Sequence, residues 1–332
     1  MSRCLCCGKE IINAKEYEES VAWHERCIKR FFGTKQLPEL DCTDETLEKL
    51  ANLTVNQGLT VPGVQKKLSL HLDSDGKKAR LTVVNYPTGY ILKPQSDEYE
   101  SLPEAELLCM RMAEIAKIPV VPNALINLNG KYAYITKRID RKDGDCYAME
   151  DFCQLSGRMT EDKYRSSYEN CGKVIKKYSR NVGLDIVELY YRLLFCFLIG
   201  NSDMHLKNFS LIEDTPGSRV YSLAEAYDML PVNVILSADQ EEMALTVNGK
   251  KRNIRKKDFL ALAENLGITN KTALTLMKKL TSYKQAFLTE VRNSYIPKEM
   301  KESLIELMEK RIEIFSCANA NKQKFRKVVD KG

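Results

Sequence analysis

The sequence predicts an α+β fold with two lobes: a small N-terminal lobe made mainly of strands and a larger C-terminal lobe made mainly of helices. Two observations carry this prediction. Strand-like segments separated by turn residues dominate residues 64–139, and helical periodicity dominates from about residue 148. The 332 residues are enough for a two-lobed domain or two domains, and 44% hydrophobic with 29% charged residues is typical of a globular protein.

The N-terminal lobe is expected to contain three strands, one helix and two more strands. The first three strands are VQKKLSLHL, ARLTVV and YILK, and the Asp, Asn, Gly and Pro residues between them favour turns. A helix follows Pro103, with apolar residues from Leu107 to Ile115 at helical spacing. NALINL and KYAYITKRI then form a pair joined by the turn NG.

The C-terminal lobe is expected to contain a buried helix that ends in the longest apolar run, Leu193–Gly200, with Asp185 as a candidate cap. The remaining expected elements are short strands at 209–212 and 220–223 and amphipathic helices at 256–281 and 297–316. The expected domains are an N-terminal extension with connector (1–44), the N-terminal lobe (45–140), the C-terminal lobe (141–318) and a polar tail (319–332).

Composition excludes several classes of protein. No apolar run approaches the roughly 20 residues that span a membrane, and the N-terminus lacks a secretory pattern. Eleven cysteines, mostly scattered singly through apolar segments, indicate a reducing cytoplasm and no disulfide framework. The net charge of +6 permits contact with nucleic acid without requiring it, and a solvated surface with slight lysine excess is the favoured explanation.

The stretch NSDMHLKN (201–208) follows the buried helix and contains the spacing D-x4-N, from Asp203 to Asn208. An Asp that orients an acceptor hydroxyl, with an Asn five residues later that binds Mg²⁺, is the arrangement of kinase catalytic loops. His205 and Lys207 could donate hydrogen bonds to the transferred oxygens. The alternative is a helix end with solvated polar residues, because D-x4-N alone is a weak signal.

Two further features fit phosphoryl transfer. Asp228 follows a short strand and could hold Mg²⁺ together with Asn208, although an isolated turn Asp is common. Lys93 ends the strand YILK, where it could contact nucleotide phosphates and pair with a Glu of the next helix. Glu104 and Glu106 are both candidates, but residues two apart point about 200° apart, and we favour Glu106.

Residues 58–70, GLTVPGVQKKLSL, contain two glycines spaced as in a Walker A loop but lack its Gly-Lys-Ser/Thr ending. A P-loop nucleoside triphosphatase is therefore not expected. A glycine-containing turn whose backbone amides bind phosphates stays plausible.

Together, GVQKKLSL, NSDMHLKNFSL and AYDML resemble the HipA-like serine/threonine kinases, the toxins of bacterial toxin–antitoxin systems, over about residues 45–316. The resemblance implies a bilobed protein-kinase-like fold, use of ATP and Mg²⁺, and a protein hydroxyl as acceptor. It implies Asp203 as the catalytic Asp, Asn208 and Asp228 as metal ligands, and Lys93 as the ATP-contacting Lys. It further implies a phosphate-binding loop of Val61, Pro62, Gly63, Val64, Gln65, Lys66 and Lys67 and a nucleotide hinge that includes Lys137, Arg138 and Asp140.

This chain differs from the family that it resembles in two respects. Full-length family members begin with a small additional domain that has no counterpart here, so this chain resembles the short HipT-like form, whose missing piece is a separately encoded protein. Family members carry an autophosphorylated regulatory serine just before the phosphate loop, where this chain has Thr60. Phosphate on Thr60 would place about −1.5 to −2 charge beside the nucleotide phosphates and so disfavour ATP binding; a structural Thr in a turn is the alternative.

The N-terminal extension contains Cys4-x2-Cys7, then His24-x2-Cys27. Paired CxxC and HxxC elements predict a tetrahedral structural zinc site, with Cys6 as an alternative to Cys4. Trp23 and a few apolar residues are not expected to form a core alone, so the metal would supply the folding energy. A metal-free extension with incidental thiols is the other interpretation.

The leading functional hypothesis is an active kinase toxin that phosphorylates itself and a translation-related protein such as an aminoacyl-tRNA synthetase. Its expected partner is a helix-turn-helix antitoxin, through which any contact with DNA would be indirect. The first alternative is a binding module in an antitoxin–DNA repressor complex, to which the basic stretch NGKKRNIRKK (248–257) would contribute. The second is a small-molecule phosphotransferase, for which the D-x4-N loop would also serve.

Overall fold

A computed structural model describes residues 3–12, 15–41, 67–74, 79–84, 86–142 and 144–316. The chain divides into two compact units, each described by itself below. The first is formed by residues 1–110 and 120–147, and the second by residues 111–119 and 148–332. No helix in the described ranges is both long enough and apolar enough to cross a bilayer.

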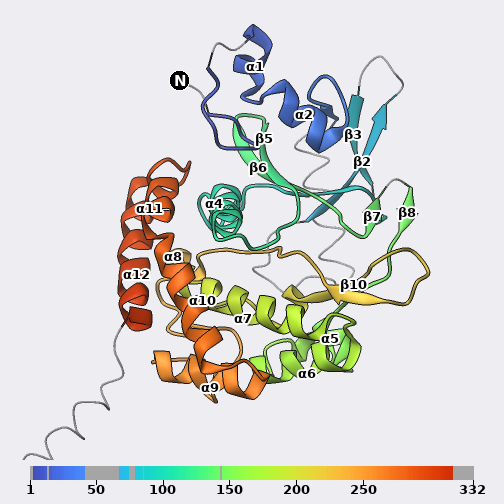
Figure 1. The fold of residues 1–332 in the computed structure, drawn as a ribbon. Coiled ribbons are helices and arrows are strands. Elements are labelled where there is room, and N and C mark those ends of the chain that lie inside the picture. Colours follow the sequence, from blue (N-terminus) through green and yellow to red (C-terminus); the bar gives the residue numbers. More distant parts are fainter. Residues whose placement is uncertain are drawn as a thin grey trace, which may run out of the picture. The chain divides into compact units, whose positions relative to one another are not determined.

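The first unit is built on a six-stranded sheet with the order β1-β3-β2-β4-β6-β5 (Figure 1). The strands are β1 (Glu39–Asp41), β2 (Leu68–Ser74), β3 (Ala79–Val84), β4 (Tyr90–Lys93), β5 (Asn123–Leu128) and β6 (Lys131–Lys137). Neighbours are antiparallel except β1, which lies parallel to β3. The five strands expected from turn residues and alternation are present. β1 was not expected, because three residues are too few to show a period.

Within the described ranges, three helices accompany this sheet: α1 (Glu16–Val21), α2 (Glu25–Phe32) and α4 (Leu102–Ile115), whose C-terminal part from residue 111 belongs to the second unit. A short hairpin, β7 (Arg141–Lys142) and β8 (Asp145–Cys146), completes the unit. Trp23 is fully buried and lies 5.7 Å, between ring centroids, from both Phe31 and Phe32, which in turn contact Tyr90 of β4. The N-terminal segment therefore shares its core with the sheet and does not fold as an isolated extension.

The second unit is arranged around α7 (Val182–Ile199). Figure 1 shows α7 in the middle of the helices, in contact with α6, α9, α10 and α12. Every residue from Leu189 to Ile199 is buried, which matches the apolar run in the sequence. Asp185 is not the cap: the helix begins at Val182, and the Asp185 carboxylate accepts hydrogen bonds from Ser179 Oγ (2.6 Å) and the Leu223 amide (2.8 Å).

The other helices of this unit surround α7, and a small antiparallel sheet has the order β11-β10-β9. Gly267, with φ of 90°, divides the expected helix 256–281 in two, since it ends α9 in the left-handed conformation. The helices are α5 (Phe152–Leu155), α6 (Tyr168–Tyr178), α8 (Val232–Ile235), α9 (Lys256–Leu266), α10 (Asn270–Ser282), α11 (Lys284–Arg292) and α12 (Lys298–Ser316), and the strands are β9 (Met149–Asp151), β10 (Ser210–Glu213) and β11 (Tyr221–Leu223).

The turn after α7 is fixed by Gly200. Its φ of 79° is left-handed, and an added Cβ would lie 2.6 Å from Leu307 Cδ2. Arg311 of α12 donates a hydrogen bond to the Phe197 carbonyl and another, of 2.8 Å, to Asn233 Oδ1. Bonds to the end of α7 thus fix the point from which the chain enters residues 201–208.

Candidate functional site

The first unit contains a buried ion pair between β4 and α4. Lys93 Nζ lies 2.6 Å from Glu106 Oε1, and both side chains are almost fully buried, at 4% and 1% exposed. Lys93 Nζ also lies 5.3 Å from the centroid of the Tyr134 ring, on the neighbouring strand β6. Charged side chains are rarely buried unless they are paired, and here each buried charge is the partner of the other.

The structure resolves the choice between the two glutamates in favour of Glu106 as the Lys93 partner. Glu104 lies elsewhere on α4, and its Oε2 is buried with no hydrogen-bond partner within the described part of the chain. Burial raises the pKa of the Glu104 carboxyl above its ordinary value. The two carboxylates therefore have different environments, as helix geometry at a spacing of two requires.

The expected hinge residues lie at the end of β6 and just after it. Arg138 forms a two-pronged contact with Asp140, with Nε–Oδ1 of 2.9 Å and a second bond of 2.6 Å, and Arg141 adds a third bond of 2.9 Å. The backbone amide of Lys137 donates to the Pro122 carbonyl. The Asp140 carboxylate is thus held by arginines, and a nucleotide-contacting role for these residues stays a prediction.

Most of the expected phosphate-binding loop lies outside the described residues. Thr60, Val61, Pro62, Gly63, Val64, Gln65 and Lys66 belong to that part of the chain. Lys67 is described and is exposed immediately before β2. The predicted roles of these residues therefore stay predictions.

In the second unit, the loop after α7 is closed by its own hydrogen bonds. The Asp203 amide donates to Asn201 Oδ1 (3.2 Å), and the Asp203 carbonyl accepts from Asn208 Nδ2 (3.0 Å). Residues Leu206–Asn208 form one 3₁₀ turn. These bonds fix the separation of Asp203 and Asn208, and they turn the nitrogen of the Asn208 amide toward the loop backbone.

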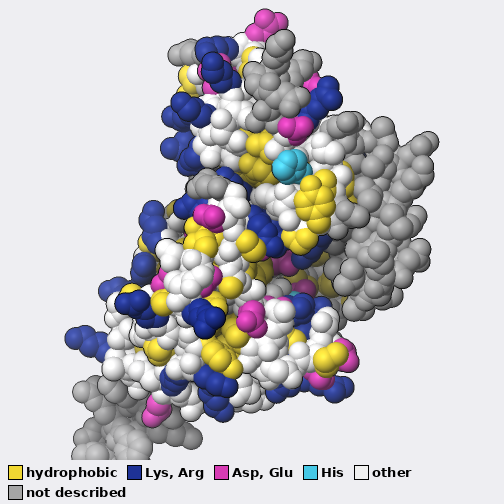
Figure 2. Space-filling model, turned by 90° about the vertical axis from the view of Figure 1, so that its right-hand side faces the viewer, with side chains coloured by type: hydrophobic (Ala, Val, Ile, Leu, Met, Phe, Trp, Pro, Cys, Tyr) yellow, Lys and Arg dark blue, Asp and Glu magenta, His cyan; other side chains and the backbone are white. Residues whose placement is uncertain are grey.

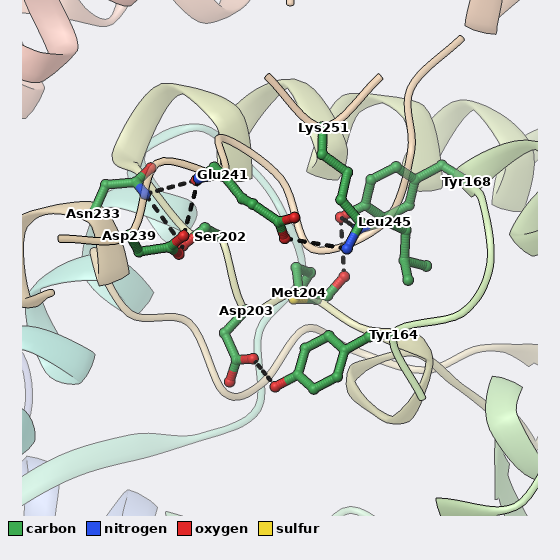
Figure 3. A network of polar contacts seen from close by, with 10 residues as sticks. All are labelled: Tyr164, Tyr168, Ser202, Asp203, Met204, Asn233, Asp239, Glu241, Leu245 and Lys251. Carbon is green, nitrogen blue, oxygen red and sulfur yellow. Dashed lines mark hydrogen bonds and ion pairs between the residues drawn. The ribbon is translucent and has the colours of Figure 1, made fainter. Parts of the chain in front are cut away.

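The Asp203 carboxylate accepts a hydrogen bond of 2.5 Å from the hydroxyl of Tyr164, as Figure 3 shows. The Tyr164 ring also packs edge-on against His205, with 5.0 Å between centroids, and His205 is buried. Burial and the nearby Asp203 charge raise the pKa of Tyr164 well above its ordinary value, so the phenol stays protonated. Tyr164 was not found from the sequence, because it lies 39 residues before Asp203 in an irregular segment.

Two further sets of contacts hold this loop, one made by Lys207 and one made by Tyr227 next to Asp228. Lys207 Nζ is paired with Asp151 Oδ2 of β9 at 2.8 Å, so its ammonium group holds the loop to the small sheet. Tyr227, next to Asp228, donates to the Lys207 carbonyl (3.2 Å) and bonds Ser210 Oγ (2.6 Å). These bonds bring the backbone at Asp228 beside the loop that ends in Asn208.

Asp228 itself has a left-handed backbone, with φ of 60°. Non-glycine residues adopt this region at a cost, and they cluster at functional sites. The role of Asp228 as a metal ligand stays a prediction.

Further hydrogen bonds hold Ser202 and Met204 of the loop (Figure 3). Ser202 Oγ donates to Asp239 Oδ2 (2.7 Å), and Asn233 Nδ2 bonds both Ser202 Oγ and the Glu241 carbonyl. Tyr168 donates to the Met204 carbonyl (3.0 Å). These partners come from segments up to 37 residues away, and no local pattern in the sequence indicates them.

The N-terminal segment holds a separate cluster. The ligand atoms of Cys4, Cys7, His24 and Cys27 all lie within 4.8 Å of one another. Cys4, and not Cys6, completes this set. Hydrogen bonds from the Cys27 and Cys4 thiols lower the pKa of Cys7, so one thiolate is already favoured in the cluster.

Comparisons of sequence identify relatives. A sequence model of the family described as "HipA-like C-terminal domain" matches residues 59–287. A Haemophilus influenzae protein that is provisionally named a kinase is 26% identical over 79% of this chain and 83% of its own length. A Sinorhizobium fredii protein with a similar provisional name, Y4dM, is 30% identical over 70% of this chain. The serine/threonine-protein kinase toxin HipA of Shewanella oneidensis is 22% identical over 67% of this chain.

Comparisons of structure agree on the fold. The Shewanella oneidensis HipA chain, solved with HipB and operator DNA, matches with a TM-score of 0.64 at 20% identity over 77% of this chain. The Helicobacter pylori proinflammatory kinase CtkA matches with a TM-score of 0.54 at 17% identity over 71% of this chain and 88% of its own. The expected combination of sheet and helices in a kinase-like fold is thereby confirmed.

The chain spans less than two thirds of several relatives: 60% of Y4dM, 54% of the Shewanella toxin sequence and 64% of the solved Shewanella chain. The family model nevertheless covers more than half of this chain, including β4, α4 and residues 201–228. With that match, the agreement in fold and the buried Lys93–Glu106 pair, this chain belongs to the HipA-like kinase family.

Proposed function

We propose that this chain is an ATP- and Mg²⁺-dependent serine/threonine protein kinase and the toxin of a HipA-type toxin–antitoxin system. The observation that carries the proposal is the buried Lys93–Glu106 pair at 2.6 Å. Removing two charges from water costs several kcal/mol per ion, and their mutual attraction offsets this cost only where the geometry is good. A strand Lys paired with a helix Glu is the arrangement by which kinases hold the α- and β-phosphates.

The second unit would supply the chemistry at the acceptor. Asp203 would orient the acceptor hydroxyl and receive its proton. It lies in a loop whose backbone is held by a hydrogen bond from the Asn208 side-chain amide to the Asp203 carbonyl. Asn208 and Asp228 would hold Mg²⁺, because an amide oxygen and a carboxylate are the hard oxygen donors that this ion prefers. Bound Mg²⁺ would neutralise phosphate charge. Lys207, paired with Asp151, would keep the loop in place, and His205 would support it through Tyr164.

The proposed partners rest on the relatives. HipA of Shewanella oneidensis was solved with HipB and operator DNA. For this chain we propose a helix-turn-helix antitoxin, contact with DNA only through that antitoxin, and a separately encoded small protein as a further partner. The proposed acceptor is a translation-related protein of the cytoplasm, such as an aminoacyl-tRNA synthetase.

Transfer of labelled phosphate from ATP to the chain itself and to synthetases in a cell extract tests the proposal. Asp203→Asn should lower the rate by about 10²- to 10⁴-fold. The control Asp145→Asn changes an exposed Asp in β8 and should keep the wild-type rate. Equal rates in wild type and Asp203→Asn would refute the assignment of Asp203.

Regulation through Thr60 is a further part of the proposal. Autophosphorylation there would add charge beside the predicted phosphate loop and lower ATP affinity. Mass spectrometry after incubation with ATP should find phosphate on Thr60 in the wild type and none in Asp203→Asn. An active wild type with unmodified Thr60 would rule the switch out.

The alternative of a DNA-binding module receives less support. Two lysines of its basic stretch 248–257 are paired with acids outside the stretch: Lys250 with Asp258 (2.8 Å) and Lys251 with Glu241 (3.1 Å). Figure 2 shows one face of the molecule, on which lysines and arginines are interspersed with acidic side chains. Strong binding to phosphates calls for clustered basic side chains that are available to the ligand.

A further inference from the structure

The four side chains of the N-terminal cluster have the spacing of a tetrahedral metal site. Zn–S bonds of about 2.3 Å and Zn–N bonds of about 2.0–2.1 Å imply ligand-to-ligand distances of about 3.6–3.8 Å. Cys7 Sγ lies 3.4 Å from His24 Nδ1, Cys27 Sγ lies 3.9 Å from the same nitrogen, and all four ligand atoms lie within 4.8 Å of one another. The two sulfur–nitrogen distances are within about 0.3 Å of these values, and the remaining separations need to shorten by at most about 1 Å to complete the tetrahedron.

The histidine is also set in the form that a metal requires. Nδ1 of His24 faces the thiols, and Nε2 lies 3.3 Å from the Glu10 carbonyl. A carbonyl only accepts hydrogen bonds, so Nε2 carries the proton and Nδ1 presents its lone pair to the cluster. Metal-binding histidines are oriented in this way by a carbonyl on the second nitrogen.

Both halves of the cluster are attached to one residue of the sheet. The Leu125 amide donates to the Leu5 carbonyl (3.0 Å), and the Leu125 carbonyl accepts from Trp23 Nε1 (3.2 Å). Leu5 lies between ligands Cys4 and Cys7, and Trp23 precedes ligand His24. Leu125 lies in β5, the last strand of the sheet, so the N-terminal segment covers an edge that would otherwise expose backbone groups.

The same segment reaches the strand that carries Lys93. α2 contains Cys27 and ends in Phe31 and Phe32, which pack on Tyr90 with 5.9 and 5.4 Å between centroids. Tyr90 donates a hydrogen bond of 3.2 Å to the Phe31 carbonyl. Tyr90 begins β4, and Lys93 ends it.

We propose that Cys4, Cys7, His24 and Cys27 bind one structural zinc ion, and that this ion anchors the N-terminal segment over the edge of β5 and against β4. Sulfur and imidazole ligands in a tetrahedron suit Zn²⁺ better than Mg²⁺ or Ca²⁺. The two ligand pairs, near residues 4–7 and 24–27, are cross-linked by the metal, and α1 and α2 are too short to be stable alone.

The test measures zinc and the environment of Trp23, the single tryptophan of the chain. Elemental analysis of protein purified without chelators should find about one zinc per chain, the count a closed tetrahedral site holds. Cys7→Ser and Cys27→Ser should lose the metal, shift Trp23 emission to longer wavelength and lower Tm by about 5 °C or more. His24→Cys should keep zinc, because a fourth thiolate also completes a tetrahedral site.

Two controls make the result specific. Cys146→Ser alters an exposed cysteine in β8, and Cys6→Ser alters a cysteine between two ligands but outside the set; both should keep zinc and the Trp23 spectrum. If ligand variants do not fold, wild-type protein is treated with a chelator and then with Zn²⁺ or Co²⁺. Reversible change of Trp23 emission and the visible bands of tetrahedral cobalt thiolate support the site.

Each part of the proposal can fail separately. Wild-type protein that holds no zinc and takes up neither Zn²⁺ nor Co²⁺ would overturn the metal site. Loss of zinc with unchanged Trp23 emission and Tm would overturn the anchoring role. Neither outcome depends on whether the chain is an active kinase.

Discussion

The hydroxyl of Tyr164 lies 2.5 Å from Asp203 Oδ1 and donates a hydrogen bond to that carboxylate. In the proposed mechanism, an acceptor hydroxyl would donate to the same carboxylate. Tyr164 is 40% exposed, and its raised pKa keeps the phenol protonated at neutral pH. In this mechanism the Tyr164 phenol would compete with the acceptor hydroxyl, because both would donate a hydrogen bond to the Asp203 carboxylate.

Tyr164→Phe removes this competing donor and leaves the ring contact with His205 intact. Because a hydrogen bond to a charged group is worth about 1.5–3 kcal/mol, phosphate transfer should rise by about 10-fold or more at low acceptor concentration. The faster transfer should appear as a lower KM for the acceptor, with kcat unchanged. Tyr178→Phe, an exposed tyrosine of α6, is the matched control. A fall in kcat with unchanged KM would instead make Tyr164 a positioning residue.

The buried pair of Lys93 and Glu106 lets stability and activity be separated. Glu106→Gln leaves a buried ammonium group without its carboxylate, which should destabilise the fold by about 3–5 kcal/mol and lower Tm by roughly 6–15 °C. The double variant Lys93→Met/Glu106→Gln removes both charges, so Tm should recover most of the loss while ATP-dependent transfer stays absent. Thermal melts and phosphate-transfer assays on the same samples measure both. Recovery of activity in the double variant would refute the role of Lys93.

Gly200 and Gly217 form a matched pair for testing the turn after α7. Both have φ near 80° (79° and 77°), but a Cβ on Gly200 would lie 2.6 Å from Leu307 whereas a Cβ on Gly217 would meet nothing within 4 Å. Gly217→Ala should cost about 1 kcal/mol from backbone strain alone. Gly200→Ala should cost about 2–4 kcal/mol, because overpacking adds to the strain. Denaturant unfolding measures the difference, and equal losses would show that Leu307 yields freely.

Glu104 predicts a pH dependence of stability. Burial raises its pKa in the folded state above the ordinary 4.5, so folding favours the protonated form. As pH rises, the unfolded chain releases this proton at a lower pH than the folded chain does. The free energy of unfolding therefore falls between pH 4.5 and the raised pKa of the folded state, and it stays lower at higher pH. Glu104→Gln should therefore raise Tm by about 1–3 °C at pH 8 and by less at pH 4.5. Glu299→Gln, an exposed site on α12, should show no such trend.

The strands β2 to β6 and helix α4 were predictable because their information is local. Turn residues mark the strand ends, and a 3.6-residue period marks α4. Helix geometry also predicted that only one of Glu104 and Glu106 faces Lys93, and the structure identifies it as Glu106. β1 was missed, since its three residues form a strand only through pairing with β3.

The sequence by itself determined the candidate groups: the D-x4-N spacing of Asp203 and Asn208, the strand Lys93 and the CxxC and HxxC pairs. Each of these patterns spans only a few residues, so local backbone geometry sets the spacing of its side chains. Only the tertiary structure decided which distant groups meet them: Tyr164 on Asp203, Asp151 on Lys207 and Leu125 on the cysteine cluster. The physical reason is that hydrogen bonds and ion pairs act over about 3 Å, and residues far apart in sequence reach that distance only after the core has packed.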